Sequence, residues 1–326
     1  MTGSIELPGL VDLQVNGAHG IDITAEPSRL WEVAAVLPAY GVTAFLPTVI
    51  TASASTRSEA LAALAAGRPP DVPPGAVPLG LHFEGPMIAE SHKGAHPAEW
   101  LAVPSTSLIE GWSREAGVAM VTLAPELPGA LEVIEELVSR GVVVSIGHTA
   151  ATSVSAAVAA GARCVTHLFN AMPPLHHRDL GPVGAALAGD LVAGVIVDGH
   201  HLDDAVARMA WQLLAPERFL LVSDATAALG APGPSVLGSQ SVSVVDSAVR
   251  LADGTLAGSS ASLLDCMRRL VQVTGCSLES AAHAAHAVPL ELLGVERGQD
   301  VIVLSPSLEV VRTVVDGEVV YEGVAA

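Results

Sequence analysis

The sequence predicts a (β/α)8 barrel of the TIM type with a small β domain attached to it. Short runs of Val, Ile and Leu alternate with longer alanine-rich segments whose apolar residues recur at helical spacing. Strands that alternate with helices form βαβ units around a parallel sheet. Such a series within ~250 residues fits a (β/α)8 barrel better than an open doubly wound sheet. No G-x-G-x-x-G pattern follows the first strand, so a dinucleotide-binding domain is not indicated.

Each element follows from its local pattern. The expected barrel strands are residues 9–15, 43–49, 77–82, 118–122, 142–146, 163–166, 193–197 and 219–222. Helical spacing is clear in residues 29–39, 130–140, 153–160 and 203–214. Residues 231–256, rich in Ser, Val and Gly, predict a loop or hairpin excursion, and helices are expected at 262–273 and 278–293. Near the end, short strands flank Asp316-Gly317, a pair typical of a tight hairpin turn.

These patterns divide the chain into a large and a small part. We expect residues 8–295 to form the barrel, and residues 1–7 together with 296–326 to form a small β appendage. Because only seven residues precede Pro8, this β domain is expected to be reduced.

Composition restricts the class of protein. Half of the 326 residues are apolar, which supplies a large core, and the net charge of −19 argues against a nucleic-acid partner. No uncharged apolar run reaches the ~18–20 residues that span a bilayer, and the N-terminal residues lack a signal-peptide pattern. The three cysteines show no CxxC spacing, which favours a reducing compartment. We therefore expect a cytoplasmic protein with neither nucleic acid nor membrane as partner.

Groups able to bind metal or transfer protons follow several predicted strands. Glu84 stands in HFEGP, His148 in SIGHT, His167 in THLFN and Asp224 in VSDAT. The carboxyl ends of barrel strands carry the active sites of such enzymes. One carboxylate with two imidazoles suits a catalytic zinc or iron ion, and Asp224 is placed to exchange a proton with an activated water. For each residue alone, a structural hydrogen bond at the barrel rim remains an alternative.

Longer stretches resemble one family, the N-acetylglucosamine-6-phosphate deacetylases of the amidohydrolase superfamily. The similar stretches are PGLVDLQVNG, GLHFEGPMIAESHKGAHP, SIGHTAAT, THLFNAMPPLHHRDLGPVGAAL, VIVDGHHL, LVSDATAALG and LAGSS. They occur in the family's order and extend from Pro8 to Ser260. The resemblance implies a metal-dependent hydrolase barrel that removes the acetyl group of N-acetylglucosamine 6-phosphate, yielding glucosamine 6-phosphate and acetate.

The resemblance also implies roles for particular residues. Those that match the family's site are Glu84, His148 and His167 as metal ligands, Asp224 as catalytic acid and base, His96 and His201 at the sugar and acetamide, and Asn170, the backbone of Ala171 and Arg178 at the phosphate. Many amidohydrolases carry an HxH pair after the first strand, but this sequence has Gln14-Val15-Asn16. Amide side chains are weak metal ligands, so we expect one divalent ion per subunit. Zn2+ is the expected ion, with Fe2+ or another divalent ion left open.

Other interpretations stay open at this point. The reaction could involve a different N-acyl sugar or N-acyl amino acid, or the chain could be a catalytically silent sugar-phosphate binding protein. The resemblance suggests a homodimer, and Arg178 could reach the site of a neighbouring subunit. His82 is expected to be packed in the barrel, His92 to be an ordinary loop residue, and Asp198 to brace the loop that precedes His201.

Overall fold

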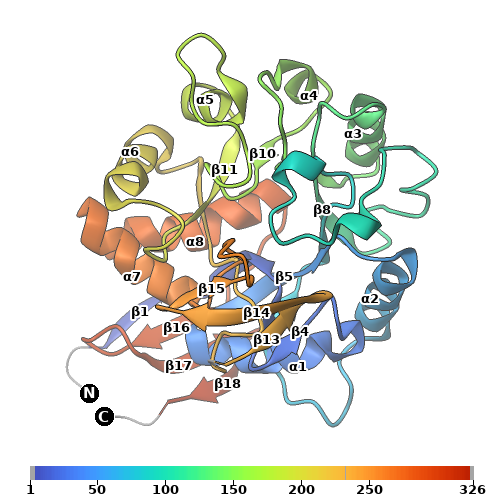
Figure 1. Ribbon diagram of the computed structural model, residues 1–326. Coiled ribbons are helices and arrows are strands. Elements are labelled where there is room, and N and C mark those ends of the chain that lie inside the picture. Colours follow the sequence, from blue (N-terminus) through green and yellow to red (C-terminus); the bar gives the residue numbers. More distant parts are fainter. Residues whose placement is uncertain (1–3, 232, 324–326) are drawn as a thin grey trace.

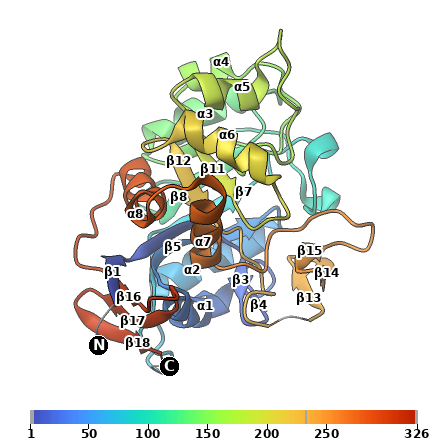
Figure 2. The same cartoon turned by 90° about the vertical axis from the view of Figure 1, so that its left-hand side faces the viewer.

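The computed structural model describes residues 4–231 and 233–323 and shows a barrel of parallel strands surrounded by helices (Figures 1 and 2). In spatial order the barrel strands are β2 (Leu10–Val15), β5 (Val42–Ile50), β7 (Leu81–Glu84), β8 (Val118–Leu123), β9 (Val143–Ile146), β10 (Cys164–Val165), β11 (Val192–Ile196) and β12 (Phe219–Val222). Each overlaps one predicted strand, so the predicted barrel is confirmed.

The seam between the first and last strands closes differently from the other strand pairs. Val15 and Ala225 form an isolated parallel bridge there. The side chain of Asp12 strengthens the seam, because its Oδ2 accepts a 2.5 Å hydrogen bond from Ser223 Oγ and its Oδ1 a 3.3 Å bond from Ser223 N. Burial raises the pKa of this carboxyl to about 6. A side chain thus replaces part of the backbone ladder that closes the barrel.

The third predicted strand is shorter and later than expected. Residues 77–82 divide into β6 (Val77–Pro78), which pairs only with β5, and β7, which continues to Glu84. The break lies at Gly80, whose φ is +113° and whose Cβ, if present, would lie 2.8 Å from the Cβ of Ala119. The glycine allows the chain to turn and pass close to β8.

The helices cover the outside of the barrel. They are α1 (Leu30–Val36), α2 (Ala54–Ala66), α3 (Ala130–Ser139), α4 (Ser155–Ala159), α5 (Gly181–Ala188), α6 (Asp204–Leu214), α7 (Leu263–Thr274) and α8 (Leu278–Leu293). The 3-10 turns η1 (Pro27–Arg29) and η2 (Leu37–Tyr40) shorten the predicted helix 29–39, and two more, η3 (Glu90–His92) and η4 (Ala98–Trp100), follow β7. The helices α2 and α5 were not predicted, because their many small residues give little apolar periodicity.

Two smaller sheets accompany the barrel. The predicted β domain is an antiparallel sheet of β1 (Ile5–Pro8), β16 (Val301–Leu304), β17 (Val310–Val315) and β18 (Glu318–Glu322), with the predicted turn at Asp316-Gly317. The predicted excursion is the antiparallel sheet of β13 (Ser235–Leu237), β14 (Gln240–Val245) and β15 (Ala248–Arg250), and β3 (Gly17–Ala18) pairs with β4 (Ile21–Asp22). Within the described residues, every helix is too short or too polar to cross a membrane.

Candidate metal and substrate site

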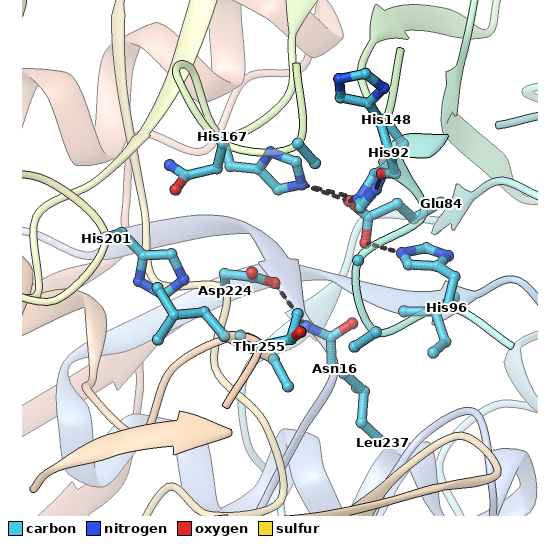
Figure 3. A pocket seen from close by; sticks show the side chains of 18 of the residues that line it. Asn16, Glu84, His92, His96, His148, His167, His201, Asp224, Leu237 and Thr255 are labelled. Carbon is cyan, nitrogen blue, oxygen red and sulfur yellow. Dashed lines mark hydrogen bonds and ion pairs between the residues drawn. The ribbon is translucent and has the colours of Figure 1, made fainter. Parts of the chain in front are cut away.

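A cavity of about 330 Å³ opens where the barrel strands end (Figure 3). Its walls come from widely separated parts of the chain. The lining includes strand-end residues (Asn16, Glu84, His148, His167 and Asp224), loop residues (His92, His96, Asn170, Ala171 and His201) and residues of and after the β13–β15 sheet (Leu237, Thr255 and Gly258). The structure therefore gathers eight of the nine predicted site residues around one cavity, all except Arg178.

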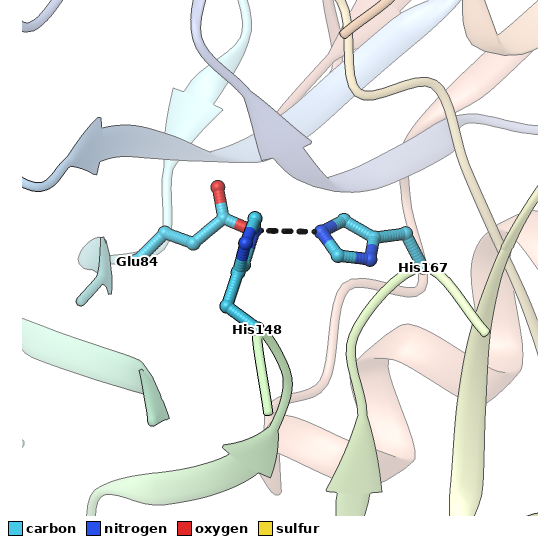
Figure 4. A group of neighbouring side chains, drawn as sticks. All are labelled: Glu84, His148 and His167. Atoms are coloured by element: carbon cyan, nitrogen blue, oxygen red, sulfur yellow. Dashed lines mark hydrogen bonds and ion pairs between the residues drawn. The ribbon is translucent and has the colours of Figure 1, made fainter. Parts of the chain in front are cut away.

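Glu84, His148 and His167 meet at one point of this cavity (Figure 4). Glu84 Oε1 lies 3.3 Å from His148 Nε2 and 3.1 Å from His167 Nε2. The two Nε2 atoms are 3.0 Å apart, and all three side chains are buried. One carboxylate oxygen and two imidazole nitrogens that converge in this way form the kind of donor set that binds zinc or iron.

The proton positions around His148 test whether a cation fits this group. His148 Nδ1 lies 2.8 Å from the carbonyl oxygen of His92, which can only accept, so Nδ1 carries the proton. Burial lowers the pKa of His148 to about 4, and its neutral ring then presents a lone pair at Nε2. This lone pair faces the Glu84 carboxylate, so two acceptors lie side by side with no proton between them. A divalent cation satisfies both, and the residues fit the metal that the family resemblance implies.

The charge of Glu84 is maintained in spite of its burial. Burial alone would raise the pKa of this carboxyl, but the neighbouring imidazoles of His148, His167 and His96 hold the pKa well below its usual value. Gln14 Nε2 also donates to Glu84 Oε1, at 3.2 Å. A carboxylate that stays ionised is suited to binding a cation.

The backbone is strained where the strands deliver these side chains. His148, His167 and Asp224 have φ values of +48°, +30° and +51°, a region that L-residues rarely occupy. Each of them lies two residues after the end of a barrel strand, β9, β10 or β12. Strain of this kind gathers at functional sites, where the surrounding structure holds it in place.

Asp224 lies across the cavity from Glu84. Burial, and then the nearby charge of Glu84, raises the pKa of Asp224 to about 7. Its Oδ1 accepts a 2.7 Å hydrogen bond from Asn16 Nδ2. The positions at the end of β2 that carry HxH in many amidohydrolases thus hold amides, Gln14 and Asn16, that donate to Glu84 and Asp224. A carboxyl with a pKa near neutrality can both accept and return a proton.

Two further histidines line the cavity with defined ring orientations. His96 Nδ1 accepts a 3.3 Å hydrogen bond from the backbone N–H of Thr51, so the neutral ring carries its proton on Nε2, 3.7 Å from Glu84 Oε2. His201 Nδ1 lies 2.8 Å from Asp198 Oδ2, and both side chains are almost fully buried. Both rings can therefore present Nε2 to a bound molecule.

Comparison with known proteins gives this arrangement a context. No protein-family model matches the sequence. The human N-acetylglucosamine-6-phosphate deacetylase is 39% identical over 352 residues, which cover 99% of this chain and 85% of the human protein. The chain belongs to the N-acetylglucosamine-6-phosphate deacetylase family. The resemblance predicted from the motifs is thereby confirmed.

Solved structures of the deacetylase family agree in fold. The Thermotoga maritima N-acetylglucosamine-6-phosphate deacetylase superimposes with a TM-score of 0.89 at 30% identity, covering 99% of this chain and 90% of that one. A mutant of the Mycobacterium smegmatis enzyme, in complex with N-acetyl-D-glucosamine 6-phosphate, gives 0.87 at 32% identity, with 97% and 87% covered.

Of the three residues predicted to bind phosphate, two line the cavity and Arg178 lies outside it. Asn170 and Ala171 line the cavity beside His167. Arg178 does not line this cavity in the same chain but lies on the exposed loop between β10 and α5, where its Nη1 is 2.7 Å from His177 Nε2. It borders a separate groove formed by the start of α4 and the length of α5.

Some contributions were not predicted from the sequence. His92, expected to be an ordinary loop residue, orients His148 through its carbonyl and lines the cavity. Leu237, Thr255 and Gly258 bring the excursion to the cavity wall. The LAGSS motif could have indicated Gly258, whereas no local signal marks Leu237 or Thr255.

Proposed function

We propose that this chain hydrolyses the acetamide of N-acetylglucosamine 6-phosphate, releasing acetate and glucosamine 6-phosphate. The observation that carries the proposal is the convergence of Glu84, His148 and His167 opposite Asp224 in one cavity. A purely binding protein would not need a metal-ligand set facing a carboxyl with a near-neutral pKa. The family membership supports this reaction over other hydrolytic reactions.

Glu84, His148 and His167 would hold one divalent ion, which we propose to be Zn2+. When bound, such an ion supplies polarisation of the acetamide carbonyl and activation of water. Asp224 takes the proton of the attacking water and returns it to the departing amine as the C–N bond breaks. His96 and His201 position the sugar and the acetamide through their Nε2 atoms.

We propose that Asn170 and the backbone of Ala171 bind the phosphate together with Arg178 of a second subunit. Guanidinium groups bind phosphate through two parallel hydrogen bonds, and the acidic chain needs such a local positive group. The exposed position of Arg178 outside its own cavity supports action between subunits. Exposed Leu175 and Leu180, on the same loop, support a homodimer contact there.

We also propose that residues 8–295 act as the catalytic unit, with 1–7 and 296–326 as an accessory β unit, and that the enzyme works in the cytoplasm. The separate antiparallel sheet of β1 and β16–β18 supports the division. Three cysteines without disulfide bonds support a reducing compartment.

Elemental analysis of purified protein, combined with an acetate-release assay, tests the function. We expect about one divalent ion per chain, and acetate from N-acetylglucosamine 6-phosphate much faster than from unphosphorylated N-acetylglucosamine. A metal-loaded protein that binds the sugar phosphate tightly but releases no acetate would contradict the proposal.

A further inference from the structure

Asp198 lies in the turn between β11 and α6 and holds two parts of that turn at once. Its Oδ1 accepts hydrogen bonds from the backbone N–H groups of His200 at 2.9 Å and His201 at 3.0 Å. Its Oδ2 lies 2.8 Å from Nδ1 of the His201 ring. The side chains of Asp198 and His201 are 3% and 5% exposed, so water scarcely competes for these bonds.

The carboxylate can only accept in this arrangement. Burial alone would raise the pKa of Asp198, but the hydrogen bonds from the His201 ring and the two backbone groups hold it well below its usual value. An ionised carboxylate has no proton to donate, so the His201 ring must donate from Nδ1. His201 lines the cavity, and its Nε2 is then the ring nitrogen that remains available to a bound molecule. Among the described residues, none forms a hydrogen bond with this Nε2.

The turn itself is fixed around this pair. Gly199 has a φ of +88°, and a Cβ there would lie 2.7 Å from the guanidinium carbon of Arg269. Arg269 in turn bonds to Asp204 at the start of α6. The loop therefore has little freedom to move Asp198 away from His201.

We propose that Asp198 is a positioning residue that keeps the proton of His201 on Nδ1 and holds Nε2 toward the substrate cavity. Neutral His201 then accepts a hydrogen bond at Nε2, for example from a substrate hydroxyl, and donates from Nε2 only as an imidazolium ion. The role of Asp198 in turnover rests on the proposed deacetylase function, whereas its control of the ring does not.

Asp198→Asn is the sharpest test, because the two backbone N–H groups orient the new amide. The N–H groups of His200 and His201 can bond only to the oxygen of the new amide, so the amide NH2 group faces His201 Nδ1. Since this NH2 group donates, Nδ1 of the neutral ring must accept, and the ring proton moves to Nε2. The same exchange in the triad of serine proteases gives the wrong histidine tautomer and costs about 10⁴-fold in kcat.

NMR of protein labelled with 15N-histidine reports this directly, with His201→Asn used to assign the signal. At a pH where the ring is neutral, we expect the Nδ1–H form in the parent and the Nε2–H form in Asp198→Asn. Asp203→Asn also removes one negative charge from this region, but it replaces the N-cap of α6 by another good N-cap residue. It is the matched control and should leave the tautomer unchanged. The same tautomer in the parent and in Asp198→Asn would overturn the proposal.

A double-mutant cycle separates positioning from simple bracing of the loop. We expect Asp198→Asn to lower kcat/KM by about 10²-fold or more, and to cost little further when His201 is already replaced by Ala. An equal loss in both backgrounds would mean that Asp198 acts only on the fold, contrary to the proposal. If the parent released no acetate, the proposed function would fail, yet the NMR comparison would still decide the claim about His201.

Discussion

Asn16 Nδ2 donates a 2.7 Å hydrogen bond to Asp224 Oδ1, which joins residues 208 positions apart at the point where the barrel closes. Burial and the charge of Glu84 raise the pKa of Asp224, and the hydrogen bond from Asn16 partly opposes them, so that the pKa is about 7. We expect Asn16→Ala to raise that pKa further, so the rise of kcat/KM with pH should move to higher pH. An unchanged pH profile would show that Asn16 does not tune Asp224.

Asp224→Asn should abolish most turnover while leaving metal binding intact. The amide keeps the shape of the side chain but cannot accept and return the proton, a contribution of about 10²–10⁴-fold. Acetate release and metal content are measured on the same sample. Substantial activity in the metal-loaded variant would exclude Asp224 as the acid and base.

His148→Ala should lose the metal, because it removes one of the three convergent side chains proposed to hold the ion. We expect metal content well below that of the parent by elemental analysis after dialysis, together with loss of activity. His200→Asn provides the control, since it removes an exposed imidazole and should retain full metal content. Equal metal retention in His148→Ala would mean that the ion binds elsewhere.

Arg178→Ala should raise KM for the phosphorylated substrate and leave unphosphorylated N-acetylglucosamine unaffected, because guanidinium binds the phosphate. If Arg178 acts between subunits, mixing Arg178→Ala and Asp224→Asn protomers should restore activity at a concentration of phosphorylated substrate well below the raised KM, where each variant alone turns over little. A hybrid dimer then contains one cavity with both Asp224 and a partner's arginine. Mixed protomers that stay inactive although they exchange would place Arg178 in its own subunit's site.

Asp22 should make the protein less stable as pH rises toward neutrality. Burial raises the pKa of Asp22 in the folded protein to about 7. Its Oδ1 accepts a 3.0 Å hydrogen bond from the backbone N–H of Gly238, between β13 and β14. Between about pH 4 and 7 the folded state binds more protons than the unfolded state, so the free energy of unfolding falls as pH rises, by up to about 3 kcal/mol from this group.

Urea unfolding of the metal-free protein at pH 5 and pH 8 measures this effect. Asp22→Asn should make the stability less dependent on pH than in the parent, because its amide does not ionise. Asp71→Asn, at an exposed position, should keep the pH dependence of the parent. A pH dependence that Asp22→Asn leaves unaltered would show that burial of this carboxyl has no energetic consequence.

Much of the site followed from the sequence because strand ends are local features. Apolar runs mark each barrel strand, and Glu84, His148, His167 and Asp224 stand at or shortly after the ends of such runs. The carboxyl ends of barrel strands meet at one face, so a correct list of strands already brings these residues together. The helices α2 and α5 escaped prediction because alanine and glycine carry little periodic signal.

The sequence by itself determined the barrel, the family and the Glu84, His148 and His167 group that could bind a metal, because these depend on short motifs and their order. Only the tertiary structure decided which groups face each other: Gln14 with Glu84, Asn16 with Asp224, and Asp198 with the ring of His201. It also placed Arg178 outside its own cavity and Leu237 inside it. The physical reason is that pKa values and ring tautomers depend on burial and on partners brought together by barrel closure, which no local pattern encodes.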